Sequence, residues 1–198
     1  MDRRIQRTRD ALMAALLELI QEKGFGAVSI QELVDRANVG RSTFYQHYES
    51  KEDLLLTGFE DMKAMLEVKP TDEKPAATGD GGRLLNFTTE LFQHLHENVR
   101  LFRAMAGKKG GTLMHQGMEK MIEELVYEDL ARRLGSKNIQ RGSLNAVCRM
   151  TAGAFSSLIP QWLGTEPVLP PKEVEQFFRQ YVLAGISAVI DLPKNKIG

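Results

Sequence analysis

Residues 41 to 48, RSTFYQHY, place an arginine, two hydroxyl groups, an amide and several aromatic rings within about two helical turns. At 100° per residue, a helix here would carry Phe44 and Tyr48 on one face. The opposite face would carry hydrogen-bonding side chains, namely Ser42, Thr43, Tyr45 and Gln46. With Arg41 at its N-terminal end, such a face suits contact with phosphates and base edges in a DNA major groove. The alternative is an ordinary solvent-exposed face, which would need no tyrosine.

The preceding segment, SIQELVDRAN, predicts a short helix of about two turns with one buried stripe. Ser29 and Glu32 have the spacing of a capping box, in which each side chain satisfies a backbone N–H of the other residue. Asn38 is a suitable left-handed exit from this helix. Because only two residues separate the two helices, they cannot pack antiparallel and must cross steeply around Val39. This arrangement is helix-turn-helix geometry.

The segment SIQELVDRANVGRSTFYQHYESKEDLL resembles the signature of the tetracycline-repressor (TetR) family, and the resemblance covers about residues 5 to 58. Two positions depart from the family pattern. Asn38 stands where the family usually has glycine, and Gly40 stands where it usually has an N-capping serine. Neither departure threatens the fold, because Asn tolerates the left-handed conformation and Gly is an acceptable N-cap.

The resemblance implies which residues line the DNA: Arg41, Ser42, Thr43, Tyr45, Gln46 and His47. It also implies that Tyr45 and His47 contact phosphates. Ser29 and Lys51 would lie at helix N-termini that face the DNA backbone, where free N–H groups favour an anion. For Lys51 a second interpretation stays open, in which the side chain only caps a surface turn.

Composition limits the possible partners. Lys plus Arg equals Asp plus Glu at 26 each, so a nucleic acid would have to meet a local basic patch rather than a positive overall field. The best local candidate is the start of the chain, which carries Arg3, Arg4, Arg7 and Arg9. A solvated helix start is the other interpretation of these arginines. The chain shows no export signal and no membrane-spanning stretch, and it has one cysteine, so we expect a cytoplasmic protein without a membrane partner.

Helical periodicity extends over nearly the whole chain and predicts an all-α fold of about nine helices. We expect a helix-turn-helix domain of three helices at residues 1–50 and a larger ligand-binding and dimerisation domain at 51–198. The first helix should span 3–23. A long fourth helix should end near residue 68 at a loop, KPTDEKPAATGDGG. Helices should resume at about 83, with later ones at 101–105, 113–134, 143–163 and 172–190.

The last two of these helices have apolar residues on more than one stripe, as expected where a helix serves both its own core and a partner. The expected dimer interface comprises Phe155, Leu158, Trp162, Phe178, Tyr181 and Gly185. An ordinary internal helical hairpin is the alternative. This region is similar to the C-terminal domain of the TetR family, in which two such helices per subunit form a four-helix dimer bundle.

A methionine-rich set in the middle helices could form a pocket for a small apolar or amphipathic ligand, since methionine adapts to irregular shapes. The set comprises Met62, Met65, Phe92, Met105, Met114, Met118 and Met121. Ordinary core packing is an equal alternative. We expect no metal site, because His94 and His96 point about 200° apart on one helix and His115 adds little.

The sequence contains no glycine-rich phosphate loop, nucleophile elbow or HExxH motif, so we expect neither an enzyme nor a cofactor. The resemblance implies a dimeric, ligand-responsive repressor that binds a double-stranded DNA operator with pseudo-palindromic sequence. Two alternatives remain: an activator that works through a protein partner, and a helical interaction protein that does not bind DNA.

Overall fold

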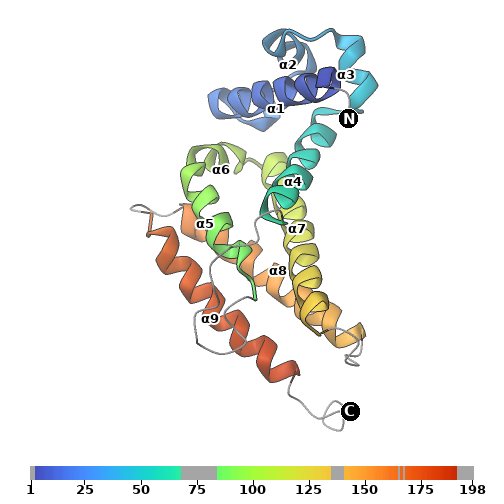
Figure 1. Cartoon of the computed structure of the whole chain (residues 1–198). Helices are drawn as coiled ribbons and strands as arrows, with labels where there is room; N and C mark the ends of the chain where they lie inside the picture. The colour runs from blue at the N-terminus through green and yellow to red at the C-terminus, as the bar shows by residue number, and fades with distance from the viewer. Residues whose placement is uncertain (1–2, 68–83, 135–140, 165, 167, 191–198) are drawn as a thin grey trace. The chain divides into compact units, whose positions relative to one another are not determined.

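The computed structural model describes residues 3–67, 84–134, 141–164, 166 and 168–190, and every regular element within them is helical. Nine α-helices and one short 3-10 helix, η1, follow one another along these residues (Figure 1). Their bounds are α1 (Arg3–Lys23), η1 (Phe25–Ala27), α2 (Ile30–Ala37), α3 (Arg41–His47), α4 (Lys51–Glu67), α5 (Phe87–Glu97), α6 (Val99–Met105), α7 (Lys108–Leu134), α8 (Arg141–Gly164) and α9 (Pro171–Ile190). The all-α prediction is therefore confirmed. In the same residues, no helix is apolar over a length that could cross a membrane.

The chain packs as two compact units. Unit 1 comprises Met1–Met62 and Asn98–Gly117, and unit 2 comprises Lys63–Glu97 and Met118–Gly198. Packing in unit 1 thus includes α6 and the start of α7 as well as the helix-turn-helix. The predicted boundary between a DNA-binding domain at 1–50 and a ligand-binding domain at 51–198 stays a prediction. The expected loop KPTDEKPAATGDGG lies outside the described residues.

Helix α1 forms the centre of unit 1 and contacts both α2 and α6. Its buried face includes Leu12, Leu16 and Ile20, which have no exposed surface. The helix ends where predicted, because Gly24 follows it with φ 78°, a conformation that glycine adopts without strain. The turn then directs Phe25 inward, where only 1% of its surface is exposed.

Helix α7 begins earlier than predicted and contains a closely packed glycine. The sequence predicted that GKKGG would end one helix and that the next would start near residue 113, but α7 already begins at Lys108. A Cβ atom on Gly110 would lie 2.7 Å from the backbone oxygen of Met105 and 3.2 Å from Cβ of Phe25. Glycine therefore occurs inside α7 because a larger residue would not fit there, and the low helix propensity of glycine is overridden.

The core of unit 2 is built from aromatic rings on three helices. Phe92 on α5 lies 5.4 Å from the rings of Phe155 and Trp162 on α8, and 5.7 Å from Phe178 on α9, measured between ring centroids. The Phe92–Phe155 and Phe155–Phe178 pairs are edge-to-face, at 83° and 78°. Such offset arrangements are favourable beyond the area they bury.

A polar cluster joins α5 to α9 beside this core. The hydroxyl of buried Thr88 lies 2.6 Å from Oε1 of Glu175 and 2.8 Å from the backbone oxygen of Leu85. Arg179 lies 3.7 Å from the same Glu175 oxygen. Leu85 has φ 62°, and its N–H donates to Asp129 at 2.7 Å. The cluster thus holds the strained turn that precedes α5.

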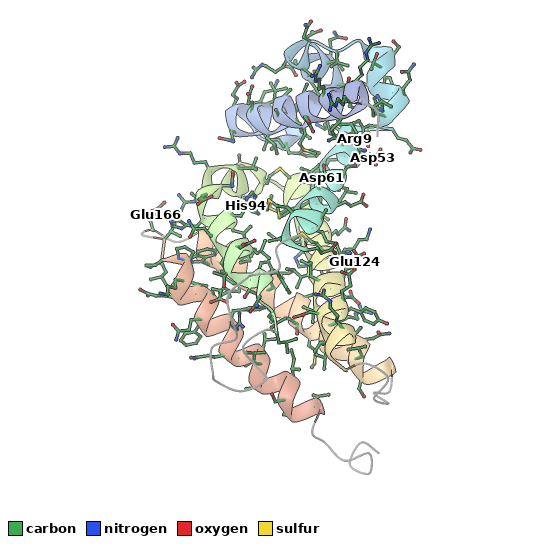
Figure 2. All side chains as sticks on the ribbon, in the orientation of Figure 1. Arg9, Asp53, Asp61, His94, Glu124 and Glu166 are labelled. Atoms are coloured by element: carbon green, nitrogen blue, oxygen red, sulfur yellow. The ribbon has the colours of Figure 1, made fainter. Side chains whose placement is uncertain are left out.

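Lys63 on α4 holds a second charged cluster in unit 2. Its Nζ lies 2.8 Å from Glu128, 3.0 Å from Glu124 and 3.2 Å from Glu67 (Glu124 is labelled in Figure 2). Hydrogen bonds to these carboxylates, foremost that of Glu128, raise the pKa of Lys63 above its ordinary range. The ammonium group is therefore charged at neutral pH.

Replacing Thr88 with valine should lower the free energy of unfolding by about 1 to 3 kcal/mol, because the buried carboxylate of Glu175 loses its shortest hydrogen bond. The neighbouring Thr89→Val variant is the matched control, since Thr89 is exposed and its hydroxyl lies 3.5 Å from Glu175. Denaturant unfolding of both variants measures the difference. Equal stability of the two would show that the buried hydroxyl is not a structural donor.

Candidate nucleic-acid interface

Helix α2 starts and ends as the sequence predicted. Ser29 is its N-cap, and the capping box is complete: the N–H of Glu32 donates to Ser29 Oγ at 3.3 Å and the N–H of Ser29 donates to Glu32 at 3.0 Å. The C-cap Asn38 has φ 52° and ψ 46°, the left-handed conformation. Gly40 then caps α3 with an extended backbone. The two departures from the family pattern are therefore accommodated without a change in the helix ends.

The two faces of α3 are sorted by burial as predicted. Phe44 has no exposed surface and Tyr48 has 5%, and their ring centroids lie 5.8 Å apart. The residues on the other side are exposed or half-buried: Arg41, Ser42, Thr43, Tyr45, Gln46 and His47. Half of the surface of Tyr45 is exposed, and its ring stands edge-on to Phe44 at 84°. The exposed face of α3 thus rests directly on the core of unit 1.

Arg41 and Tyr45 pack against each other on the exposed face of α3. The guanidinium carbon of Arg41 lies 5.8 Å from the centroid of the Tyr45 ring, a cation–π distance. The two side chains are one helical turn apart, so this contact restricts the rotamers of both. A long basic side chain is thereby held against the exposed face of the helix.

Arg9 has a role that the sequence did not reveal. Its Nε donates to the hydroxyl of buried Tyr48 at 3.1 Å, which joins α1 to the end of α3 (Arg9 is labelled in Figure 2). Arg9 therefore supports the end of α3, whereas Arg3, Arg4 and Arg7 are exposed at the start of α1. Sequence spacing could not separate Arg9 from its neighbours, because its partner is 39 residues away.

Charges around α2 are paired within unit 1. Arg36 donates to the two carboxylate oxygens of Glu22 at 2.8 and 3.0 Å, and Lys23 pairs with Glu32. Hydrogen bonds from Lys23 and from Ser29 lower the pKa of Glu32 to about 2. Glu32 is therefore ionised at neutral and mildly acidic pH, and the capping box is retained there.

Lys51 and Ser29, the two residues expected at the DNA backbone, differ in their surroundings. Ser29 is exposed, and its hydroxyl lies 2.6 Å from Glu32 as part of the capping box. The ammonium of Lys51 instead points back at the turn that precedes α2 and donates to the backbone oxygens of Phe25 and Val28. This geometry matches the second interpretation of Lys51, in which the side chain caps a turn.

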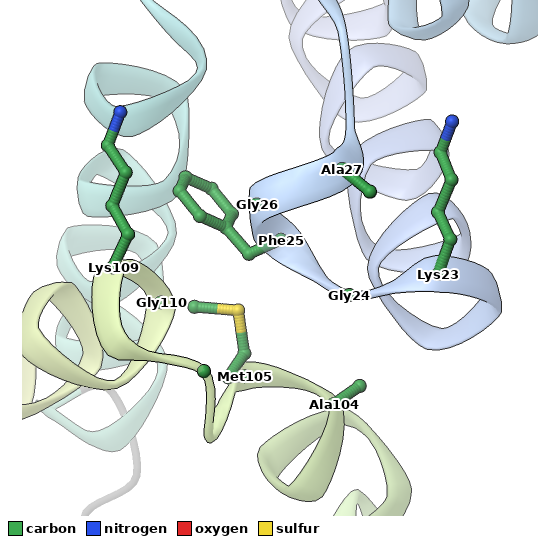
Figure 3. Close-up of a pocket in the computed structure, with 10 residues that line it drawn as sticks. Lys23, Gly24, Phe25, Gly26, Ala27, Ala104, Met105, Lys109 and Gly110 are labelled. Atoms are coloured by element: carbon green, nitrogen blue, oxygen red, sulfur yellow. The ribbon is translucent and has the colours of Figure 1, made fainter.

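The structure divides the methionine-rich set between the two units. Met62, Met105 and Met114 belong to unit 1, and the other four residues, Met65, Phe92, Met118 and Met121, belong to unit 2. Phe92, Met105, Met118 and Met121 are buried, whereas 45% of the Met65 surface is exposed. Met105 lines a half-open cavity of about 240 Å³ in unit 1, together with Phe25, Gly110 and the side chains of two lysines (Figure 3). That the whole methionine-rich set forms one ligand pocket stays a prediction.

The residues expected at a dimer interface also fall into two groups. Phe155, Trp162 and Phe178 are at most 5% exposed and form the aromatic core of their own protomer. Leu158 is half-buried, and Gly185 and Tyr181 are exposed, Tyr181 to 75%. Phe177, one helical turn before Tyr181, is also exposed, to 80%.

Two family models match the chain. Residues 12–57 match the model described as bacterial regulatory proteins of the tetR family. Residues 82–183 match the model described as a transcriptional regulator C-terminal region. The matched ranges include α2 and α3 in the first case and α5 to α8 in the second.

Two curated relatives are similar to parts of the chain. The HTH-type transcriptional regulator TcmR of Streptomyces glaucescens is 34% identical over 132 residues, which is 61% of this chain and 50% of TcmR. The uncharacterized HTH-type transcriptional regulator YxbF of Bacillus subtilis (strain 168) is 44% identical over 57 residues, 28% of this chain and 15% of YxbF. The chain thus spans half or less of the length of these relatives.

Among solved structures, the fold is similar to that of RolR in complex with the ligand resorcinol. The TM-score is 0.58 with 21% sequence identity, and the match covers 100% of both chains. At this identity the likeness shows the fold alone.

The two faces of α3 should respond differently to substitution. Phe44→Ala removes a fully buried ring and should cost about 3 to 5 kcal/mol of stability. Gln46→Ala removes an exposed side chain and should change stability by less than about 0.5 kcal/mol. Thermal melting of both variants checks this expectation. A fully stable Phe44→Ala variant would contradict the assignment of the buried face.

Proposed function

Because the chain belongs to the TetR family of bacterial transcriptional regulators, we propose that it is a ligand-responsive repressor that binds a pseudo-palindromic DNA operator as a homodimer. The observation that carries this proposal is the sorting of α3 into two faces. One face is fixed in the core by Phe44 and Tyr48, and the other presents hydrogen-bonding groups to solvent. Insertion into a major groove needs a helix of this kind.

The outward side chains of α3 have different proposed roles. Gln46 would read a base edge, since a Gln amide can bond an adenine at two atoms, and Arg41 suits a guanine in the same way. Tyr45 and His47 would contact phosphates, and Ser42 and Thr43 would line the groove. Ser29 would face the DNA backbone at the N-terminus of α2, where free N–H groups favour an anion.

Positive charge for the DNA backbone would come from the start of α1. The bond between Arg9 and Tyr48 sets α1 beside the end of α3, and Arg3 and Arg7 are exposed on the preceding turns. Phosphate contacts of this kind supply affinity that does not depend on sequence and that falls with salt. The neutral net charge of the chain is compatible with such a local patch.

The proposed dimer uses the exposed apolar face of α8 and α9. Phe177 and Tyr181 on α9 are 80% and 75% exposed, and Met150 on α8 is 63% exposed. Ala184 and Gly185 continue the α9 face with small residues, which permit close helix packing. A four-helix contact between two copies would cover this face and would present two α3 helices to half-sites one or more helical turns apart.

The proposed inducer is a small apolar or amphipathic molecule that binds in unit 2. Phe92, Met118 and Met121 are buried there, and methionine side chains adapt to ligands of varied shape. RolR, which is similar in fold, was solved with resorcinol, a small aromatic diol. The ligand can release DNA only through a different affinity for the bound and free arrangements of the dimer. We assign no catalytic activity to the protein. A regulator that binds operator DNA would act in the cytoplasm.

A charge on the α9 face should separate the dimer without unfolding the protomer. In Tyr181→Asp, an unpaired carboxylate would be buried between two copies, which costs several kcal/mol. Sedimentation at micromolar concentration should give a monomer with an unchanged circular dichroism spectrum. Tyr127→Asp, which alters another exposed tyrosine on α7, should remain a dimer. If Tyr181→Asp and Tyr127→Asp both sediment as dimers, the α9 face is not the interface.

DNA binding is tested by footprinting on genomic fragments from the source organism. The proposal predicts protection of an inverted repeat, with the two halves one or more helical turns apart. It also predicts that protection disappears above moderate salt concentrations. Absence of any protected fragment at low salt would contradict the repressor function.

A further inference from the structure

The ammonium group of Lys51 is held within unit 1. Its Nζ donates to the backbone oxygen of Phe25 at 2.9 Å and to that of Val28, and it lies 4.7 Å from the centroid of the Phe25 ring. An ammonium has three donors, so two carbonyls and a ring face occupy most of its bonding capacity. Partial burial of the side chain lowers the pKa of Lys51 from its ordinary value.

The position of these contacts along the chain gives them a structural consequence. Val28 immediately precedes Ser29, the N-cap of α2, and Lys51 is the first residue of α4. The helix-turn-helix segment, residues 29–50, lies between them. The bond from Lys51 to Val28 therefore joins the two ends of this segment, and the bond to Phe25 attaches it to the η1 turn.

The η1 turn is itself fixed by packing. Phe25 is 1% exposed, and its Cβ lies 3.2 Å from the position that a Cβ on Gly110 would take. Figure 3 shows the Phe25 ring between the turn and the first residues of α7. Glu52, the neighbour of Lys51, pairs with Lys109 on α7 at 2.7 Å. Lys51 thus attaches the helix-turn-helix to the η1 turn, which is also fixed by the packing of Phe25 against α7.

We propose that Lys51 is a positioning residue, which fixes α3 for DNA binding by joining the ends of the helix-turn-helix segment, and that it does not contact phosphate. The inference rests on the proposed DNA-binding function. A recognition helix that is oriented before binding loses less conformational freedom on DNA, so the bond raises affinity without touching the operator.

The Lys51→Met variant tests this role, because it keeps the apolar stem and removes the ammonium. Its melting temperature should fall by about 4 to 8 °C, as expected for the loss of charge-assisted hydrogen bonds. Amide hydrogen exchange at residues 25–33 of the free protein should become faster. Operator affinity should fall at every salt concentration while the salt slope is retained. Lys172→Met, at an exposed lysine of α9, controls for the loss of one positive charge and should change none of these.

A phosphate contact predicts the opposite pattern. The salt slope of Lys51→Met would then fall by up to about one unit per subunit, with unchanged melting and exchange. That result would overturn the proposal. Melting and exchange are measured without DNA, so they test the positioning role even if the proposed operator binding fails.

A measurement on the unmodified protein covers the case in which Lys51→Met does not fold. The ammonium resonance of Lys51, assigned by its loss in Lys51→Arg, should be visible by nitrogen-15 NMR in the free protein, because bonded donors exchange slowly with water. Operator DNA should leave this resonance unchanged. A resonance that appears only when DNA is added would overturn the proposal.

Discussion

The burial of Phe44 is the contact that holds α3 in place. Helix α3 has only seven residues, and a helix of that length is not stable alone in water. The fully buried ring of Phe44, with Tyr48 beside it, fixes α3 to the core of unit 1. Because the buried ring sets the rotation of the helix about its axis, it also determines that Gln46 and Tyr45 face outward.

Supports from distant parts of the sequence complete this anchoring. Arg9 bonds the hydroxyl of Tyr48 from α1, and Lys51 bonds the backbone on the other side of the helix-turn-helix. Both are cations that a count of basic residues would assign to DNA. In the structure Arg9 donates to a side-chain hydroxyl and Lys51 donates to backbone oxygens of the same protein.

Local signals in the sequence predicted much of this arrangement, and long-range packing accounts for what they missed. The capping box of Ser29, the exit at Asn38 and the faces of α3 depend on neighbouring residues, so spacing alone predicts them. The need for glycine at position 110 depends on the close approach of the Met105 backbone, and the partners of Lys51 are backbone oxygens, which leave no side-chain signal. The wide apolar stripes of α8 and α9 likewise do not tell which side faces the protomer's own core.

Selection of bound sequences from a random DNA library tests the central claim most directly. If α3 reads DNA, the wild-type protein should enrich an inverted repeat, and Gln46→Ala should weaken the preference at one position in each half-site by about 1 to 3 kcal/mol without changing the other positions. An enriched sequence without symmetry, or a consensus that Gln46→Ala leaves unchanged, would contradict the assignment of α3 as the helix that reads DNA.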